Sequence, residues 1–317
     1  MILITGATGL VGRQLTPHLL AAGWPVRVLV QPRRSGRMPS LPWPNDLGVE
    51  VVSGSLDDPA SLHPAMHNVH TVIHLASAQW WGTRRDLEQV DIQGTRNVIA
   101  AARSARIGRL IYLSQLGAEP SSAYTLMRIK GQAESLVRNS GVAFTIMRCG
   151  VVFGPEDRFV NGMAMLMRTN PFFYFQPGHG DSLLHPLYVT DLVKALGNSL
   201  NRIDLVDATI EIGGGEYLTY NEMIRTVMRV SGAQRIIVNV PPYLLRSINR
   251  LVSRVVRRWP MTPQWFDILA TNRTANLGNL YDYCGVRPVR FEDTLLTYMP
   301  HRRYSLEMLR FLWYRPS

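Results

Sequence analysis

The chain has 317 residues, enough to bury a sizeable core either as one large α/β domain or as a core with a smaller lobe. Its two cysteines, Cys149 and Cys284, lack metal-like spacing, which favours buried thiols in a reducing compartment over a disulfide scaffold or a metal site. The net charge of +11 with only 18% charged residues points to an anionic partner: lipid headgroups, an acidic protein face or nucleic acid.

The chain begins with an apolar strand over residues 1–4, followed by the glycine-rich run TGATGLVG and a helix pattern. Gly6 allows a tight strand-to-helix turn, Gly9 lets the backbone approach a pyrophosphate, and Gly12 lets helix and strand pack closely. The N–H groups at the helix start then hold phosphates. The run predicts dinucleotide binding, with Thr8, Leu10 and Val11 beside the glycines at the cofactor.

A second buried strand over residues 26–30 leads into Gln31, Arg33 and Arg34. An NAD-selective site places an acid near position 31 to accept the ribose 2′-hydroxyl, and this chain has none there. Guanidinium groups suit a 2′-phosphate, so we expect NADP(H), with NAD(H) the lesser alternative. A third strand over residues 49–52 leads into Ser55 and Leu56, where the loop of such folds cradles adenine.

Further strands are predicted over residues 71–75, 110–114, 142–148 and 209–212, with helices over 94–105 and 127–140. This alternation predicts a Rossmann-type, doubly wound parallel sheet. We expect residues 1–155 to form the nucleotide-binding domain, with 185–212 returning to it. Residues 156–184 and 213–317 then form a smaller, mostly helical lobe, in which 171–180 reads as a loop lined with aromatic residues.

The motifs identify the chain as similar to extended short-chain dehydrogenases/reductases. They are TGATGLVGR, HLAS at residues 74–77, DIQGTRN at 91–97 and YVTDL at 188–192. The string GPEDRFVN at 154–161 resembles an atypical branch, which contains the NAD(P)H-binding accessory subunit of respiratory complex I and photosystem assembly factors. The resemblance implies a cofactor site that also includes Leu75, Ala76, Ser77, Ser114, Lys130 and Val151.

The family's carbonyl–alcohol chemistry needs a tyrosine four residues before a lysine on one helix face. Lys130 fits the lysine position, but the residue four before it is Leu126. Tyr124 faces elsewhere on the helix unless the turn is irregular, although a rival register pairs it with Arg128, four residues on. Ser114 matches the family's hydroxyl position. We therefore list Lys130, Tyr124 and Ser114 as catalytic candidates and lean against enzymatic activity. Lys130 is able to hold ribose hydroxyls without catalysis, and Ser114 either binds a carbonyl or ties the strand end.

Residues 243–259 predict an arginine-rich amphipathic helix that ends before Pro260. Its arginines belong either to an ordinary lobe helix whose apolar stripe packs on the core, or to a surface that docks on anionic lipid or an acidic protein face. The tail over residues 301–315 repeats the mixture of aromatics and arginines. No platform of interleaved aromatic and basic residues is visible, so we do not expect nucleic-acid binding.

The sequence thus predicts an NADP(H)-binding accessory, assembly or redox-sensing subunit of a membrane electron-transfer complex. Two alternatives stay open: an active NADPH-dependent reductase or sugar-nucleotide-type epimerase or dehydratase, and a soluble NADPH-sensing regulator. Trp80 and Trp81 either line the site of the cofactor or of an apolar ligand such as a quinone, or they pack inside the lobe. The first strand begins at residue 1 and no apolar run approaches a membrane span, so we expect no signal peptide and a cytoplasmic protein peripheral on the inner face of a membrane.

Overall fold

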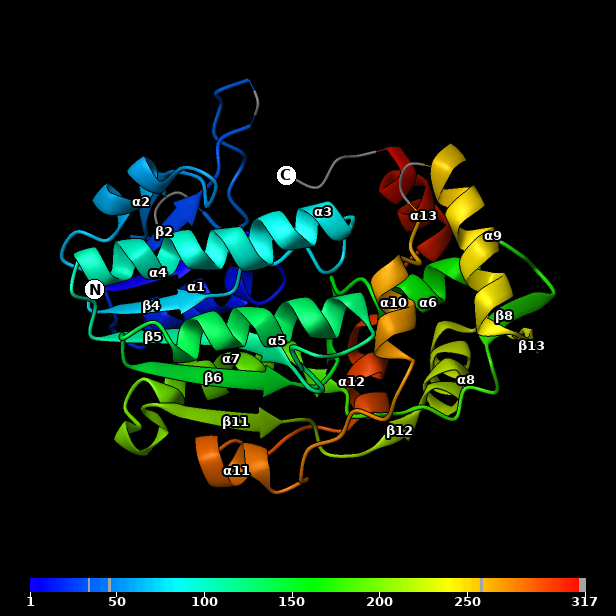
Figure 1. Cartoon of the computed structure of the whole chain (residues 1–317). Coiled ribbons are helices and arrows are strands. Elements are labelled where there is room, and N and C mark those ends of the chain that lie inside the picture. The colour runs from blue at the N-terminus through cyan, green and yellow to red at the C-terminus, as the bar shows by residue number, and fades with distance from the viewer. Residues whose placement is uncertain (34, 45–46, 257–258, 314–317) are drawn as a thin grey trace.

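The computed structural model describes residues 1–33, 35–44, 47–256 and 259–313, apart from the side chains of residues 253–255, 311 and 313. Figure 1 shows a central sheet covered by helices on both faces, with a helical lobe beyond the ends to which the strand arrows point. The predicted doubly wound parallel sheet is confirmed. It has seven strands in the order β11-β6-β5-β4-β1-β2-β3.

The sheet strands are close to their predicted positions, because buried apolar runs between turn residues mark them well. They are β1 (Ile2–Thr5), β2 (Val26–Val30), β3 (Glu50–Ser53), β4 (Thr71–His74), β5 (Arg109–Gln115), β6 (Phe144–Cys149) and β11 (Ala208–Ile212). Every neighbouring pair is parallel. The strand order reverses between β1 and β4, and the crevice outside the carboxyl ends at such a point is where these folds bind ligands.

The helices around the sheet are α1 (Gly12–Ala21), α2 (Pro59–Ala65), α3 (Arg84–Leu87), α4 (Thr95–Ser104), α5 (Thr125–Arg138), α7 (Val189–Ser199) and α11 (Asn279–Cys284). A π-helical turn, η1 (Glu88–Gly94), joins α3 to α4, and a short 3₁₀ turn, η2 (Ile203–Leu205), precedes β11. Although α11 is late in the sequence, it packs against α7 and β11. This C-terminal segment therefore covers the sheet.

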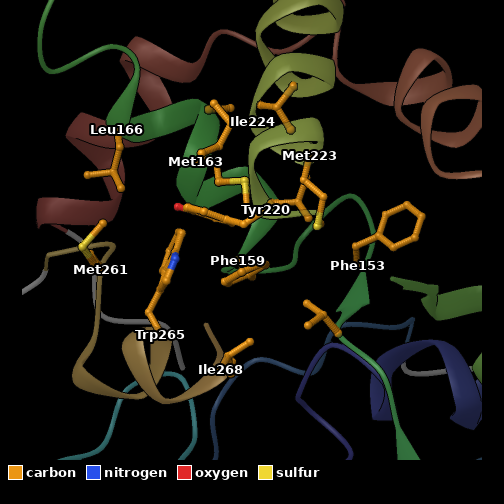
Figure 2. Close-up of a cluster of buried hydrophobic side chains, with 14 of the residues drawn as sticks. Phe153, Phe159, Met163, Leu166, Tyr220, Met223, Ile224, Met261, Trp265 and Ile268 are labelled. Carbon is orange, nitrogen blue, oxygen red and sulfur yellow. The ribbon is translucent and has the colours of Figure 1, made fainter. Parts of the chain in front are cut away.

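The lobe contains α6 (Val160–Leu166), α8 (Tyr220–Ser231), α9 (Pro242–Val255), α10 (Pro263–Ile268), α12 (Phe291–Tyr298) and α13 (Tyr304–Trp313). Its short strand pairs are β7 (Val152–Phe153) with β10 (Leu187–Tyr188), β9 (Leu183–Leu184) with β12 (Leu218–Thr219), and β8 (Phe173–Pro177) with β13 (Ile236–Val240). Its core surrounds Trp265, with Phe159, Tyr220 and Met163 close by (Figure 2).

Two expectations for the lobe were wrong. The predicted aromatic loop over 171–180 contains β8, because Tyr174 and Gln176 alternate inward while Phe173 and Phe175 alternate outward, which is the pattern of a strand with one buried face. The basic helix expected to extend to residue 259 ends at Val255, well before Pro260. Of its arginines, Arg257 and Arg258 and the side chain of Arg254 lie outside the described residues.

Candidate functional site

The glycine-rich turn between β1 and α1 leaves the backbone bare at the carboxyl edge of the sheet. Gly6 has a φ of +73°, and a Cβ there would lie 2.7 Å from the Ala76 backbone nitrogen. A Cβ on Gly12 would lie 2.5 Å from the Gly6 carbonyl oxygen, so helix and turn touch without side chains between them. Gly9 borders the open cleft. This cradle fits a pyrophosphate at a helix N-terminus.

A cleft of about 1980 Å³ extends from this turn toward the lobe. Its walls include most of the predicted cofactor residues that the structure describes: Gly6, Thr8, Gly9, Leu10, Val11, Gln31, Arg33, Ser55, Leu56, Leu75, Ala76, Ser77, Ser114, Lys130 and Val151. Gly12 is buried behind the turn, and Arg34 lies outside the described residues. One cleft thus gathers residues from six strand ends.

Lys130 forms a buried ion pair with Asp91 of η1. The distance from Lys130 Nζ to Asp91 Oδ1 is 2.8 Å, and Asp91 Oδ2 accepts a hydrogen bond from the Ala78 backbone N–H at 3.0 Å. Burial alone lowers the pKa of the Lys130 ammonium, but the nearby Asp91 and Tyr112 more than offset this and raise it. The lysine is therefore a fixed cation in the cleft wall.

Behind this pair, His74 bridges two threonine hydroxyls. Its ring nitrogens lie 2.6 Å from Thr5 Oγ1 and 3.0 Å from Thr95 Oγ1, and the Thr95 hydroxyl donates to the Asp91 carbonyl oxygen. Burial, reinforced by the charge of Lys130, lowers the pKa of His74 to about 4. The imidazole is thus neutral at physiological pH and ties β1 and β4 to the start of α4 under the cleft.

Ser114 lines the cleft, but its hydroxyl is engaged with the protein. It donates to Glu134 Oε1 at 2.6 Å, and Glu134 also pairs with Arg148 and Arg138 at 2.7 Å each. This contact corresponds to the alternative in which Ser114 ties the end of its strand to its surroundings. A substrate carbonyl would have to compete with a buried carboxylate for this hydroxyl.

The two possible tyrosine positions do not line the described part of the cleft. Leu126 is fully buried in the lobe core, and its backbone N–H donates to Asp267 Oδ2 at 3.0 Å. Tyr124 is the residue just before α5 and packs against the same core. The neighbouring Thr125 and Asp267 reach the cleft instead. Among these side chains the cleft therefore receives a hydroxyl and a carboxylate, and no phenol.

The GPEDRFVN string forms a tightly bonded turn between sheet and lobe. The Asp157 carboxylate accepts the backbone N–H groups of Phe159 and Val160 and the amide of Asn161 at 2.7 Å. Asn161 Oδ1 in turn accepts the hydroxyl of Tyr304 at 2.9 Å. Burial raises the pKa of Asp157 to about 6, although these hydrogen bonds act against the rise. The string therefore holds α6 and α13 against the cleft.

Several cleft residues were missed by sequence reasoning. Arg13 donates to the Thr8 carbonyl oxygen and forms an ion pair with Glu156, which ties the glycine turn to the GPEDRFVN string. Asp91 lies behind the cleft lining as the partner of Lys130, and it belongs to the DIQGTRN motif but was not predicted as a site residue. Asp91 stands 39 residues before Lys130, in η1 and not in α5, so no local pattern shows the pairing. The available signal was that a buried lysine needs a buried acid as its partner. Gln79 and Asp267 carried no local signal.

The helix α9 has two different faces. At 3.6 residues per turn, Arg246, Asn249 and Arg250 fall on one side, and all three line the cleft. Leu244, Ile248 and Leu251 fall on the opposite side and are 45%, 46% and 63% exposed. Among the described apolar side chains of this helix, Leu245 alone is buried. Of the two alternatives for this helix, the one in which the whole apolar stripe packs on the core is therefore wrong, while Arg246 and Arg250 are exposed at the cleft wall.

Two structural features are absent from the described residues. No helix among them is long and apolar enough to cross a bilayer. They also contain no cluster of three or more His, Cys, Asp or Glu side chains suited to hold a metal ion.

Comparisons with known proteins agree with this geometry. Residues 6–160 match a family described as NAD(P)H-binding. A solved nucleoside-diphosphate-sugar epimerase from Staphylococcus aureus superposes with a TM-score of 0.74 at 16% identity, covering 93% of this chain and 99% of that one, which shows the shared fold. The resemblance to the atypical short-chain dehydrogenases/reductases is confirmed, and the chain carries an NAD(P)H-binding Rossmann domain.

Three curated relatives are similar in sequence. The photosystem II assembly factor Ycf39 of Cyanophora paradoxa is 34% identical over 48% of this chain and 46% of its own length. The ceramide reductase of Caulobacter vibrioides is 34% identical over 54% and 52%, and the mitochondrial NADH dehydrogenase [ubiquinone] 1 alpha subcomplex subunit 9 of Arabidopsis thaliana is 31% identical over 69% and 55%. The chain thus spans about half the length of these relatives.

Proposed function

We propose that this NAD(P)H-binding chain is a non-catalytic accessory, assembly or redox-sensing subunit of a membrane electron-transfer complex. The observation that carries the proposal is Leu126, which occupies the family's tyrosine position and is fully buried in the lobe core. Without a phenol at the cleft wall, the usual proton donor for carbonyl–alcohol exchange is missing. A bound dinucleotide then acts by stabilising the native state that binds it.

The cofactor we propose is NADP(H). Gln31 and Arg33 line the cleft where the adenosine ribose of such folds lies, and position 31 carries no acid. The Arg33 guanidinium suits a 2′-phosphate through charge-assisted hydrogen bonds. When bound, the cofactor supplies a hydride-carrying nicotinamide, while the buried Lys130 ammonium supplies a positive charge close to the ribose hydroxyls.

The partner surface we propose is a docking face made of exposed apolar side chains from α9 and from the β8–β13 pair: Leu244, Ile248, Leu251, Phe172, Phe173, Phe175 and Ile236. Both elements lie at the end of the molecule farthest from the sheet (Figure 1). Exposed apolar patches of this kind mark interaction sites. The net charge of +11 on this chain favours a partner whose surface is anionic. The exposed Leu306 and Leu309 of α13 extend the partner surface into the C-terminal tail.

The relatives support this proposal. One relative is a photosystem II assembly factor and another is a subunit of the mitochondrial NADH dehydrogenase [ubiquinone]. We propose a cytoplasmic location, peripheral on the inner face of a membrane.

The test is purification of the tagged protein from gently solubilised membranes, with its partners identified and its released nucleotide assayed. We expect recovery with a multisubunit electron-transfer complex, stoichiometric NADP(H) and no turnover with carbonyl or quinone substrates. Sedimentation with phosphatidylglycerol vesicles, compared with phosphatidylcholine vesicles, shows whether lipid alone suffices. A soluble protein that binds NADPH without partner or membrane would instead support the regulator alternative.

The second candidate is an active NADPH-dependent reductase, or an enzyme of the epimerase or dehydratase type. Lys130 and Ser114 both line the cleft, and the ceramide reductase relative is named for an activity. Turnover of NADPH that is lost in Tyr124→Phe or Ser114→Ala would favour this candidate over the accessory role.

A further inference from the structure

The cleft is larger than a single ligand requires. Its volume of about 1980 Å³ compares with roughly 300–1,000 Å³ for a typical small-molecule site. The walls beyond the glycine turn come from residues 80–84, α9 and residues 259–267. We call this part the lobe half of the cleft. It leaves room for a second ligand beside the dinucleotide.

The lobe half has an apolar wall. Its lining includes three tryptophans, a methionine and a phenylalanine: Trp80, Trp81, Trp259, Met261 and Phe266. Trp80 is braced by Phe159 at a ring-centroid distance of 5.9 Å, and Trp81 is 58% exposed. Aromatic and thioether side chains gathered at a cleft wall offer a large apolar contact area, which an elongated apolar ligand is able to cover.

The same half carries an excess of positive charge. Arg84, Arg246 and Arg250 line it, with Arg158 at its junction with the glycine-turn half, against the carboxylates of Glu156, Asp157 and Asp267. Asp157 is engaged by backbone N–H groups of its own turn. Asp267 accepts the Leu126 N–H and lies 3.5 Å from Arg246. The charge balance therefore favours an anionic group among the arginines.

Three buried oxygens on this wall have no hydrogen-bond donor among the described residues: Asn249 Oδ1, Thr262 Oγ1 and Gln264 Oε1. Asn249 and Gln264 are 5% and 3% exposed, and the Gln264 amide already donates to the Gly82 carbonyl oxygen at 2.7 Å. Buried acceptors without donors are costly, so they call for an explanation. The three oxygens are themselves closed to solvent, so a ligand in the cleft reaches them only if side chains of this wall move.

We propose that the lobe half binds an amphiphile with a long apolar body and an anionic head group. The apolar body contacts the tryptophan wall, and the head group pairs with the arginines of α9. The inference rests on the proposed function, because it assigns the glycine-turn half to NADP(H). The helix α9 then divides two tasks: Arg246 and Arg250 face the ligand, while Leu244, Ile248 and Leu251 face the partner surface.

The experiment is a titration of the NADPH-loaded protein with decyl phosphate, followed by calorimetry and by tryptophan fluorescence. We expect stoichiometric binding with a tryptophan signal. The parallel probes are decanol, which lacks the charge, butyl phosphate, which lacks the apolar body, and UDP-glucose. Each is expected to bind roughly tenfold or more weakly, because a charged hydrogen bond or several buried methylenes are lost.

Matched variants locate the site. Arg250→Gln leaves the Arg246–Asp267 contact intact and is expected to weaken decyl phosphate binding roughly tenfold. Arg103→Gln on α4 removes the same charge from an exposed position outside the cleft lining and should change nothing. The triple variant Leu244→Ser, Ile248→Ser, Leu251→Ser alters the opposite face of α9 and should leave this binding unchanged. Retained NADPH binding verifies that each variant is folded.

The outcomes separate the two proposals. NADPH binding without decyl phosphate binding overturns the amphiphile site and leaves the proposed function standing. If decanol binds as tightly as decyl phosphate, the anionic head group is not recognised, and if butyl phosphate does, the apolar body is not. Tighter binding of UDP-glucose would show that the site takes a sugar nucleotide and not an amphiphile. Loss of decyl phosphate binding only in the triple serine variant would place the ligand on the docking face, against this inference. Failure to bind NADP(H) at all would contradict the proposed function itself.

Discussion

Lys130 Nζ lies 2.8 Å from Asp91 Oδ1, and both side chains are almost completely excluded from solvent. The pair joins α5 to η1 across the cleft wall, so a lysine expected at the cofactor is also a structural cation. Removing one partner of a buried pair leaves the other charge uncompensated, which is more costly than removing both.

We therefore expect Asp91→Asn to lower the free energy of unfolding by about 3–5 kcal/mol. The double variant Asp91→Asn, Lys130→Met should lose less free energy of unfolding than the two single variants lose together. The difference, a coupling energy of about 0.5–3 kcal/mol, is measured by urea denaturation. Glu88→Gln, which breaks the exposed pair with Arg84, serves as the control and should cost about 1 kcal/mol or less. Additive effects at Asp91 and Lys130 would contradict the pairing.

Substitutions at Gly9 and Gly6 should have different effects, the first on nucleotide binding and the second on stability. A Cβ on Gly9 would meet only the Gly6 carbonyl oxygen, at 3.2 Å. A Cβ on Gly6 would clash with the backbone of residues 75 and 76, and the turn holds Gly6 at a positive φ that side chains disfavour. Gly9→Ala should keep the fold but abolish the rise in Tm that NADPH produces, because the methyl group occupies the pyrophosphate cradle. Gly6→Ala should lower stability without ligand, by roughly 1–3 kcal/mol.

Thermal unfolding with and without NADPH measures both effects. Gly215→Ala is a suitable control, since its nearest neighbour lies at 3.5 Å and no positive φ is required. A Gly9→Ala protein with an unchanged NADPH response would argue against the cradle.

Arg33 should decide the cofactor preference. Arg33→Ala removes a charged contact to a 2′-phosphate, so we expect NADPH affinity to fall roughly tenfold or more while NADH affinity is unchanged. Gln31→Asp should favour NADH by accepting the 2′-hydroxyl and repelling a phosphate. The comparison variant is Arg37→Ala, since Arg37 is not among the described cleft-lining residues. If Arg33→Ala lowered the affinities for NADPH and NADH equally, Arg33 would not decide the preference for NADPH.

Asp157 should make stability depend on pH. Its pKa rises from an ordinary 3.8 to about 6 in the fold, so between these values the native state holds a proton that the unfolded state has released. The free energy of unfolding should therefore fall as pH rises from about 4 to about 6, by roughly 3 kcal/mol at about 1.4 kcal/mol per pKa unit.

Urea denaturation at a series of pH values measures this slope. Asp157→Asn has no carboxyl to titrate, so its curve should lack that part of the slope, whereas the exposed Asp293→Asn should follow the parent protein. Identical slopes in the parent and Asp157→Asn would show that the carboxyl does not titrate in this window.

The sequence alone determined the features that depend on short-range sterics and periodicity. Glycines 6, 9 and 12 specify a turn that only residues without a Cβ allow, and the alternation of buried strands and helices specifies a parallel sheet. The absence of tyrosine at position 126 is likewise visible in the letters themselves.

Tertiary structure decided what depends on which face meets which neighbour. The segment 173–177 becomes a strand because β13 lies beside it, although its own aromatic run resembles a loop. The arginines of α9 face the cleft because the helix packs through Leu245, a choice that the helical repeat alone leaves open. The pairing of Lys130 with Asp91 requires the sheet to bring α5 and η1 together. Such contacts join residues far apart in the chain, and their energy depends on burial, which no local pattern records.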